Sequence, residues 1–267
     1  MKQIIFSFDD GRLDTYTIAY PIMKKYGLPF TLNVTTDFVL NPERYTNFGS
    51  ANNKSMRSKQ VLDCYQNGVE IACHGHTHKN TKDDVLKNIS ALEEMGIDAN
   101  GIGFASPNSE VTKNNCADLQ ELLKEGKLSY IRSGRQVRRE GFVYSVLTML
   151  ERLTHSKWLF YILNKRNIIT DSKQDILMSV GITAKNTLNQ ILYLVDKVKD
   201  GQSLILMFHS VLSTEDIGYG KDLWYFDSMM FEKLVSTLVE NKNVKICTTK
   251  DLIISSASKK GSINGNS

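Results

Sequence analysis

Short apolar runs alternate with helix-like segments over most of this chain, and this alternation limits the folds open to it more than any other feature. We expect strands at 3–8, 30–34, 69–73, 102–105, 128–131, 204–208 and 244–247. We expect helices at 15–26, 58–66, 82–95, 117–123 and 231–240, the first of them kinked or broken at Pro21. Strands and helices that alternate over this length predict a parallel α/β sheet or a barrel.

The stretch from 141 to about 200 breaks this rhythm, because it carries two long helical patterns, around 143–163 and 188–198. This part of the chain is also richer in basic residues, at Arg138, Arg139, Lys165 and Arg166. We therefore expect one domain, residues 1–253, that contains a helical insertion at about 141–200. Residues 254–267 are poor in apolar side chains, which predicts a disordered tail.

The composition fits a globular protein, since 41% hydrophobic and 23% charged residues permit a large core. A net charge of +4 favours an anionic substrate or carrier. The Lys and Arg residues are scattered, so nucleic acid is not an expected partner. The four cysteines lie far apart without a C-x-x-C pair, which argues against structural zinc and a disulfide framework.

Targeting segments are not apparent in this sequence. The first residues lack the pattern of a secretory signal, and no run approaches the roughly 20 apolar residues that span a bilayer. We therefore expect a cytoplasmic protein without a transmembrane segment.

Polar clusters follow several of the expected strands. Asp9, Asp10 and Gly11 come after the first strand, and His-Gly-His-Thr-His at 74–78 comes after the third. Pro107 and His209 also follow expected strands. Active sites of parallel α/β folds form at the C-terminal ends of the strands, so in a barrel all of these residues would converge on one face.

The His cluster is suited to a transition metal. His74 and His78 are four positions apart and supply two imidazole ligands. Either Asp9 or Asp10 can be the third ligand, and the other carboxylate can act as general base on a metal-bound water. We expect His76 to point away from the metal and His209 to act as a general acid. A solvated His-rich loop is the alternative.

These motifs resemble those of the polysaccharide deacetylases, carbohydrate esterase family four. Ser-Phe-Asp-Asp-Gly at 7–11 is similar to their first motif, Thr-Phe-Asp-Asp-Gly. Residues 74–78 are similar to the second motif, His-x-x-x-His, and Leu-Met-Phe-His at 206–209 to the late motif, Leu-x-His. The resemblance extends over about residues 3–252, with 141–200 outside it.

The resemblance implies an α/β fold, a distorted (β/α) barrel with fewer than eight strands. It implies a divalent metal, zinc or another transition metal such as cobalt, and hydrolysis of an N-acetyl or O-acetyl group on a sugar. Asp9 matches the catalytic base, and His209 matches the catalytic acid. The positions of the metal ligands correspond to Asp10, His74 and His78.

One motif departs from the family pattern. The third motif is Arg-x-Pro-aromatic, whose Arg orients the base, whereas this chain has Ala105, Ser106, Pro107 and Asn108 there. The proline is kept, and the backbone N–H at Asn108 can still serve the oxyanion. Arg132, after the fifth strand, is the candidate to replace the missing charge, on its position alone.

The sequence therefore predicts a metal-dependent hydrolase that removes an N-acetyl group from a saccharide or from a sugar linked to a nucleotide or lipid carrier. A deformylase or O-acetyl esterase is one alternative. The missing motif arginine leaves a second alternative, a non-catalytic metal-containing protein that binds sugar. Basic residues of the 141–200 stretch are a candidate contact for an anionic lipid or pyrophosphate carrier, and the aromatic residues at 224–226 for a sugar.

Overall fold

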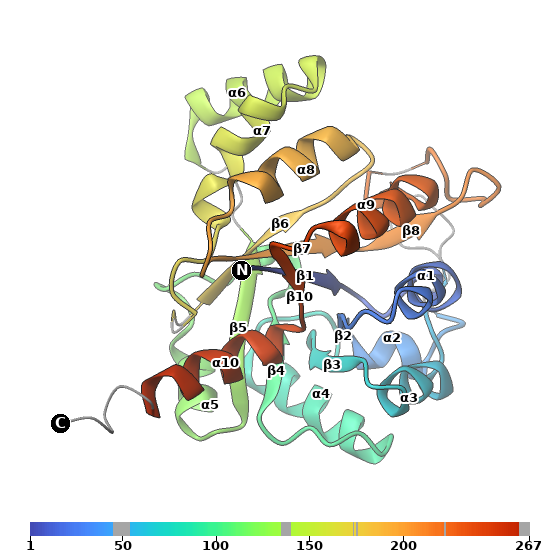
Figure 1. The fold of residues 1–267 in the computed structure, drawn as a ribbon. Helices are drawn as coiled ribbons and strands as arrows, with labels where there is room; N and C mark the ends of the chain where they lie inside the picture. Colours follow the sequence, from blue (N-terminus) through green and yellow to red (C-terminus); the bar gives the residue numbers. More distant parts are fainter. Residues whose placement is uncertain (45–53, 135–139, 173, 175, 222, 262–267) are drawn as a thin grey trace.

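Parallel strands form a closed barrel in the computed structural model, which describes residues 1–44, 54–134, 140–172, 174, 176–221 and 223–261 (Figure 1). The barrel strands are β1 (Lys2–Phe8), β2 (Thr31–Val34), β3 (Glu70–Cys73), β4 (Ile102–Ala105), β5 (Leu128–Gly134), β6 (Ile176–Gly181) and β7 (Ser203–Phe208). They lie in chain order, and β1 pairs with β7 to close the ring. The predicted distorted barrel with fewer than eight strands is confirmed.

The distortion lies at β1. The strand β10 (Val244–Ile246) pairs with the first residues of β1, Lys2 to Ile4, whereas β2 pairs with its last two, Ser7 and Phe8. Because β7 occupies the other edge of β1, β10 and β2 share one edge and meet different halves of the strand. A second, two-stranded sheet is formed by β8 (Ser210–Leu212) and β9 (Tyr225–Asp227).

Helices cover the barrel on the outside (Figure 1). They are α1 (Tyr20–Lys25), α2 (Thr36–Leu40), α3 (Ser58–Gln66), α4 (Lys82–Glu94), α5 (Ala117–Lys124), α6 (Phe142–Thr154), α7 (Lys157–Asn164), α8 (Leu188–Lys197), α9 (Ser228–Glu240) and α10 (Thr249–Gly261). A π-helical turn, η1 (Thr15–Ala19), precedes α1, and the 3₁₀ turns η2 (Pro107–Ser109) and η4 (Lys165–Asn167) follow β4 and α7. A break at Pro21 is not seen, because the backbone stays helical from η1 into α1; Pro21 lies in the first turn of α1, directly after the π-helical turn. None of the helices in the described ranges has the length and apolar content needed to cross a lipid bilayer.

Alternation along the strands separates two cores. Phe6 and Phe8 point outwards into the main core beneath the helices, where they pack on Phe208 and Phe231. Ile5 instead belongs to a smaller cluster with Ala72, Tyr130, Leu177 and Ile205. These residues lie on the inner faces of their strands and fill the barrel. Tyr130 leaves no room opposite it, because a Cβ at Gly103 would lie 2.0 Å from its ring.

Two further expectations need correction. The 141–200 stretch is not only a helical insertion, because it contains the barrel strand β6 and the helix α8. A short apolar run between helical patterns cannot be recognised as a strand from periodicity alone. The tail is also more ordered than expected, since α10 extends to Gly261 and is anchored at its start by the buried Leu252. Residues 262–267 lie outside the described ranges.

Candidate metal centre and active site

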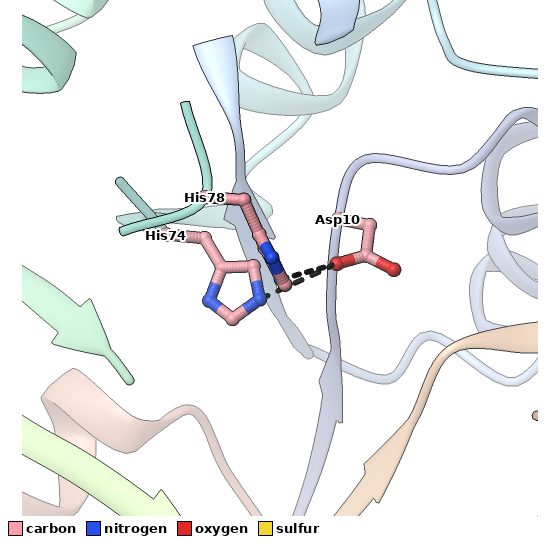
Figure 2. Close-up of side chains that lie close together, drawn as sticks. All are labelled: Asp10, His74 and His78. Carbon is pink, nitrogen blue, oxygen red and sulfur yellow. Dashed lines mark ion pairs between the residues drawn. The ribbon is translucent and has the colours of Figure 1, made fainter. Parts of the chain in front are cut away.

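Three side chains meet at the C-terminal ends of β1 and β3 and point towards one another (Figure 2). Asp10 follows β1, and His74 and His78 come from the loop after β3. The Asp10 Oδ1 atom lies 3.4 Å from the Nε2 atoms of both His74 and His78. Two ligands bound to one tetrahedral zinc ion at about 2.1 Å lie about 3.4 Å apart. The donor set and its spacing therefore fit a zinc-like ion.

Hydrogen bonds orient the histidine ligands. His74 Nδ1 lies 2.9 Å from the carbonyl oxygen of Ala105, which can only accept, so Nδ1 carries the proton and Nε2 is available for the metal. The ring of His78 stacks on Phe38 at 5.9 Å. The loop between the ligands is held by the buried Asp84 carboxylate, which accepts N–H bonds from Thr77 and Lys79.

Backbone in the left-handed region also marks the site. The φ angles are 74° at Asp10, 76° at Gly11 and 62° at His78. Residues other than glycine adopt this region rarely, and such outliers concentrate at functional sites. The positive φ at Gly11 permits the tight turn that follows the two aspartates.

A buried network holds the second oxygen of Asp10. Arg12 Nε donates to Asp10 Oδ2 at 3.0 Å, and Arg12 Nη1 donates to Ser210 Oγ at 3.1 Å. Ser210 Oγ in turn donates to Asp14 Oδ2 at 3.0 Å. Burial raises the pKa of Asp14 to about 6, against the opposing effect of Arg12. For Asp10, burial also raises the pKa, but Arg12, His74 and His78 outweigh it and hold the pKa well below its usual value.

The other carboxylate of the pair, Asp9, is bound by an arginine from across the barrel. Arg132 Nη2 lies 2.7 Å from both Asp9 oxygens, and Asn33 Nδ2 donates to Asp9 Oδ1 at 2.8 Å. Burial alone would raise the pKa of Asp9, but the charge of Arg132 is the main opposing effect and the pKa is lowered. Asp9 is therefore a carboxylate at neutral pH.

The origin of this arginine explains the departure in the third motif. Ala105 stands where the motif has its arginine, and it is the register partner of Arg132 on the neighbouring strand β5. The structure thus brings a guanidinium from the next strand to Asp9. Arg132 is anchored by a second bond, from Nη1 to Ser179 Oγ at 3.1 Å.

His209 follows β7 and carries a buried ring nitrogen. Its Nδ1 has no hydrogen-bond partner among the described residues, and its ring centroid lies 4.7 Å from that of Trp224. Burial lowers the pKa of His209 to about 4, although Asp10 and Asp9 oppose this shift. The imidazole is therefore neutral near pH 7.

The other residues singled out in the sequence are not part of the three-residue cluster. Pro107 is buried in η2, and Asn108 is exposed with φ 55°. Nothing in the structure tests Asn108 as an oxyanion donor, so that role stays a prediction. His76 bonds Thr36 Oγ1 through Nδ1 at 2.8 Å and is not part of the three-residue cluster.

Some sequence predictions beyond the centre can also be compared with the structure. Of the aromatic residues at 224–226, Trp224 is exposed, whereas Tyr225 and Phe226 are buried in β9. Arg138 and Arg139 lie outside the described ranges.

Sequence reasoning missed the residues that surround the two carboxylates. They are Arg12, Asp14, Asn33, Ser179 and Ser210. Asn33 offered one signal, a polar residue inside the apolar strand expected at 30–34. Nothing in the sequence distinguishes Arg12 from an arginine that faces solvent.

Comparisons with known proteins agree with this fold. The family model of polysaccharide deacetylase matches residues 1–124. Three solved structures share the barrel, and no curated protein sequence matches the chain. A candidate polysaccharide deacetylase from Mycobacterium smegmatis is 13% identical with a TM-score of 0.58, over 97% of this chain and 91% of that chain.

The other two structures are more distant. Peptidoglycan deacetylase PdaC from Bacillus subtilis is 12% identical with a TM-score of 0.52, over 100% of this chain and 98% of that one. A mutant of BA3943, a family-four pseudoenzyme with restored enzymatic activity, is 12% identical with a TM-score of 0.50, over 94% and 67%. The resemblance predicted from the motifs is confirmed, and the solved structures show that the chain shares their fold.

Proposed function

We propose that this chain, a divergent relative of the polysaccharide deacetylases, is a metal-dependent hydrolase that removes an N-acetyl group from a sugar. The observation that carries the proposal is the pairing of Asp9 with Arg132 beside the three candidate ligands. A catalytic metal site needs an open coordination position and a base, and a three-residue ligand set next to a charged carboxylate supplies both.

Each residue has a role that follows from its surroundings. Asp10, His74 and His78 would hold zinc or a similar ion, which when bound lowers the pKa of water and polarises a carbonyl group. Asp9 takes the proton of the attacking water. Arg132 and Asn33 keep the Asp9 carboxylate charged and fixed in orientation, because both donate to it in a buried environment.

His209 supplies a proton to the departing nitrogen. Its ring is neutral near pH 7, so it first accepts at a free ring nitrogen the proton that Asp9 has taken from water, and the imidazolium that results then donates a proton to the departing nitrogen. The proton count therefore closes within the site, and both carboxylates are ionised again when the amine leaves. The Arg12 network keeps Asp10 in place throughout.

The pairing of Asp9 also bears on the non-catalytic alternative. That alternative rested on the missing motif arginine, and one of the similar structures is a pseudoenzyme. Here Arg132 contacts both oxygens of Asp9, which favours a working base. The identity of the metal, the identity of the sugar, and the choice among N-acetyl, O-acetyl and N-formyl substrates stay predictions.

The test is acetate release from N-acetylated oligosaccharides by protein loaded with zinc or cobalt, run beside O-acetylated and N-formylated sugars. Asp9→Asn should abolish release while metal content stays near that of the wild type. Asp98→Asn is the matched control, since this exposed carboxylate lies outside the site and its loss should leave the rate unchanged. Metal binding without release from any substrate would favour the binding protein, and failure to bind metal would overturn the proposal.

A further inference from the structure

The helix α6 carries an apolar stripe on its outward face. The exposed fractions are 83% for Phe142, 66% for Val143, 54% for Met149, 40% for Leu150 and 72% for Leu153. These residues recur every three to four positions or lie next to one another, so they form one side of the helix. A helix on the surface of a globular domain normally presents this side to the core.

The opposite side of α6 faces the protein and carries the more buried residues of the helix, Tyr144, Leu147, Thr148 and Glu151. Glu151 is buried there and accepts a hydrogen bond of 2.6 Å from Gln190 Nε2 on α8. Figure 1 shows α6 as the outermost layer, with α7 between it and α8. Within the described ranges, α6 therefore turns its apolar side away from the barrel. Trp158 on α7 is also exposed, at 57%.

The helices α6 and α7 together carry a net positive charge. Residues 141–167 contain four basic side chains, and their single acidic residue is the buried Glu151. The basic residues are Arg152, Lys157, Lys165 and Arg166, of which Arg166 also lies 4.0 Å from Glu140. The helix pair thus combines an exposed apolar stripe with a net positive charge, and both features favour binding to an anionic membrane interface. The Lys157 ammonium also lies 5.2 Å from the centre of the Tyr193 ring on α8. A second copy of this surface would bring like charges together.

We propose that α6 and α7 dock on the surface of an anionic phospholipid bilayer. The stripe from Phe142 to Leu153 enters the boundary between headgroups and acyl chains, and the lysines and arginines lie near the phosphates. This surface is independent of the reaction proposed above, because none of its residues belongs to the metal centre or contacts Asp9.

The test is cosedimentation of the full chain with vesicles of phosphatidylcholine alone or mixed with phosphatidylglycerol. The wild type should bind the mixed vesicles and lose binding as salt is raised, because exposed charges are screened. Phe142→Ser with Leu153→Ser should lower binding at least about tenfold, since two large apolar side chains no longer enter the interface. Lys157→Gln with Lys165→Gln should lower it by about fivefold for each charge removed.

Ile217→Ser with Met229→Ser is the matched control, because these residues are 69% and 71% exposed and lie outside the helix pair. Its binding should equal that of the wild type, and all variants should keep the wild-type melting temperature and their rate on a water-soluble sugar. Wild-type protein that stays in solution with both vesicle types would overturn the proposal. So would a concentration-dependent dimer, seen by sedimentation velocity, that the Phe142 and Leu153 substitutions dissociate.

Discussion

Replacing Arg132 with methionine tests how Asp9 is kept charged. Arg132 and Asp9 are both buried, and one guanidinium nitrogen lies 2.7 Å from each carboxylate oxygen. Removing one partner of a buried ion pair costs about 3–5 kcal/mol, because the other charge stays buried without compensation. We expect Arg132→Met to lower the free energy of unfolding by about that amount at neutral pH.

A double-mutant cycle separates the ion pair from ordinary packing. Asp9→Asn leaves the buried Arg132 guanidinium without its counter-charge, so in that background Arg132→Met removes an uncompensated charge and should cost about 0 kcal/mol or stabilise the protein. The coupling between the two positions is then about 3–5 kcal/mol, the full cost of removing Arg132 from the intact pair. Urea unfolding of the metal-free proteins measures it.

The pH dependence gives a second readout of the same pair. In the wild type the lowered pKa of Asp9 contributes stability that is present above the ordinary carboxyl pKa and is lost as the pH falls through the lowered value. In Arg132→Met burial raises the pKa of Asp9, so a fall in pH protonates Asp9 and removes its uncompensated buried charge. The stability gap between the two proteins should therefore narrow in acid.

Lys25→Met is the control for this experiment, because Lys25 forms an exposed ion pair with Glu232 at 2.6 Å. It should change stability far less than Arg132→Met does. Equal costs of Arg132→Met in the wild-type background and in the Asp9→Asn background would refute the reasoning, since they would mean that the two side chains do not interact energetically.

Three further predictions follow from the site. Arg12→Met should weaken zinc binding by about 10–100-fold in an indicator titration, because Asp10 loses its orienting partner, and an unchanged affinity would contradict that role. His209→Gln should make the metal-free protein less sensitive to acid. Between pH 6.5 and about 4 only the unfolded wild type binds a proton at His209, so the wild type loses on the order of 3 kcal/mol of its free energy of unfolding, and the variant does not. Urea unfolding at pH 7 and pH 4.5 measures this, and an equal loss of stability in both proteins would refute it. Trp224→Ala should raise KM more than it lowers kcat, because this exposed ring lies on His209 where a sugar would bind, and steady-state kinetics showing the reverse would argue against a binding role.

Residue periodicity was sufficient for the parts of the fold that depend on local preferences. The run from Gln3 to Phe8, for example, places Ile4, Phe6 and Phe8 on one face, as expected of a strand against a core, and Asp9 and Asp10 follow it directly. The helix α3 lies where it was expected. The strand β6 was missed because its short apolar run lies between helical patterns and has no periodicity of its own.

The candidate ligands were predictable because parallel strands place their C-terminal ends together. Asp10, His74 and His78 each follow a strand, so barrel closure alone brings them near one another. Their backbone conformations, with positive φ at Asp10 and His78, could not be predicted, since no glycine marks those positions.

The partners of the two carboxylates were decided only by tertiary structure. Arg132 lies 123 residues from Asp9, and Arg12 reaches Ser210 across 198 residues. Such pairs depend on strand register, because a shift of one residue turns a side chain to the other face. The outward stripe of α6 has the same origin, since the sequence shows an apolar side but not which way it faces. The sequence by itself predicted the candidate ligands and the carboxylate beside them, and the packing of distant strands determined which charges stand next to those residues.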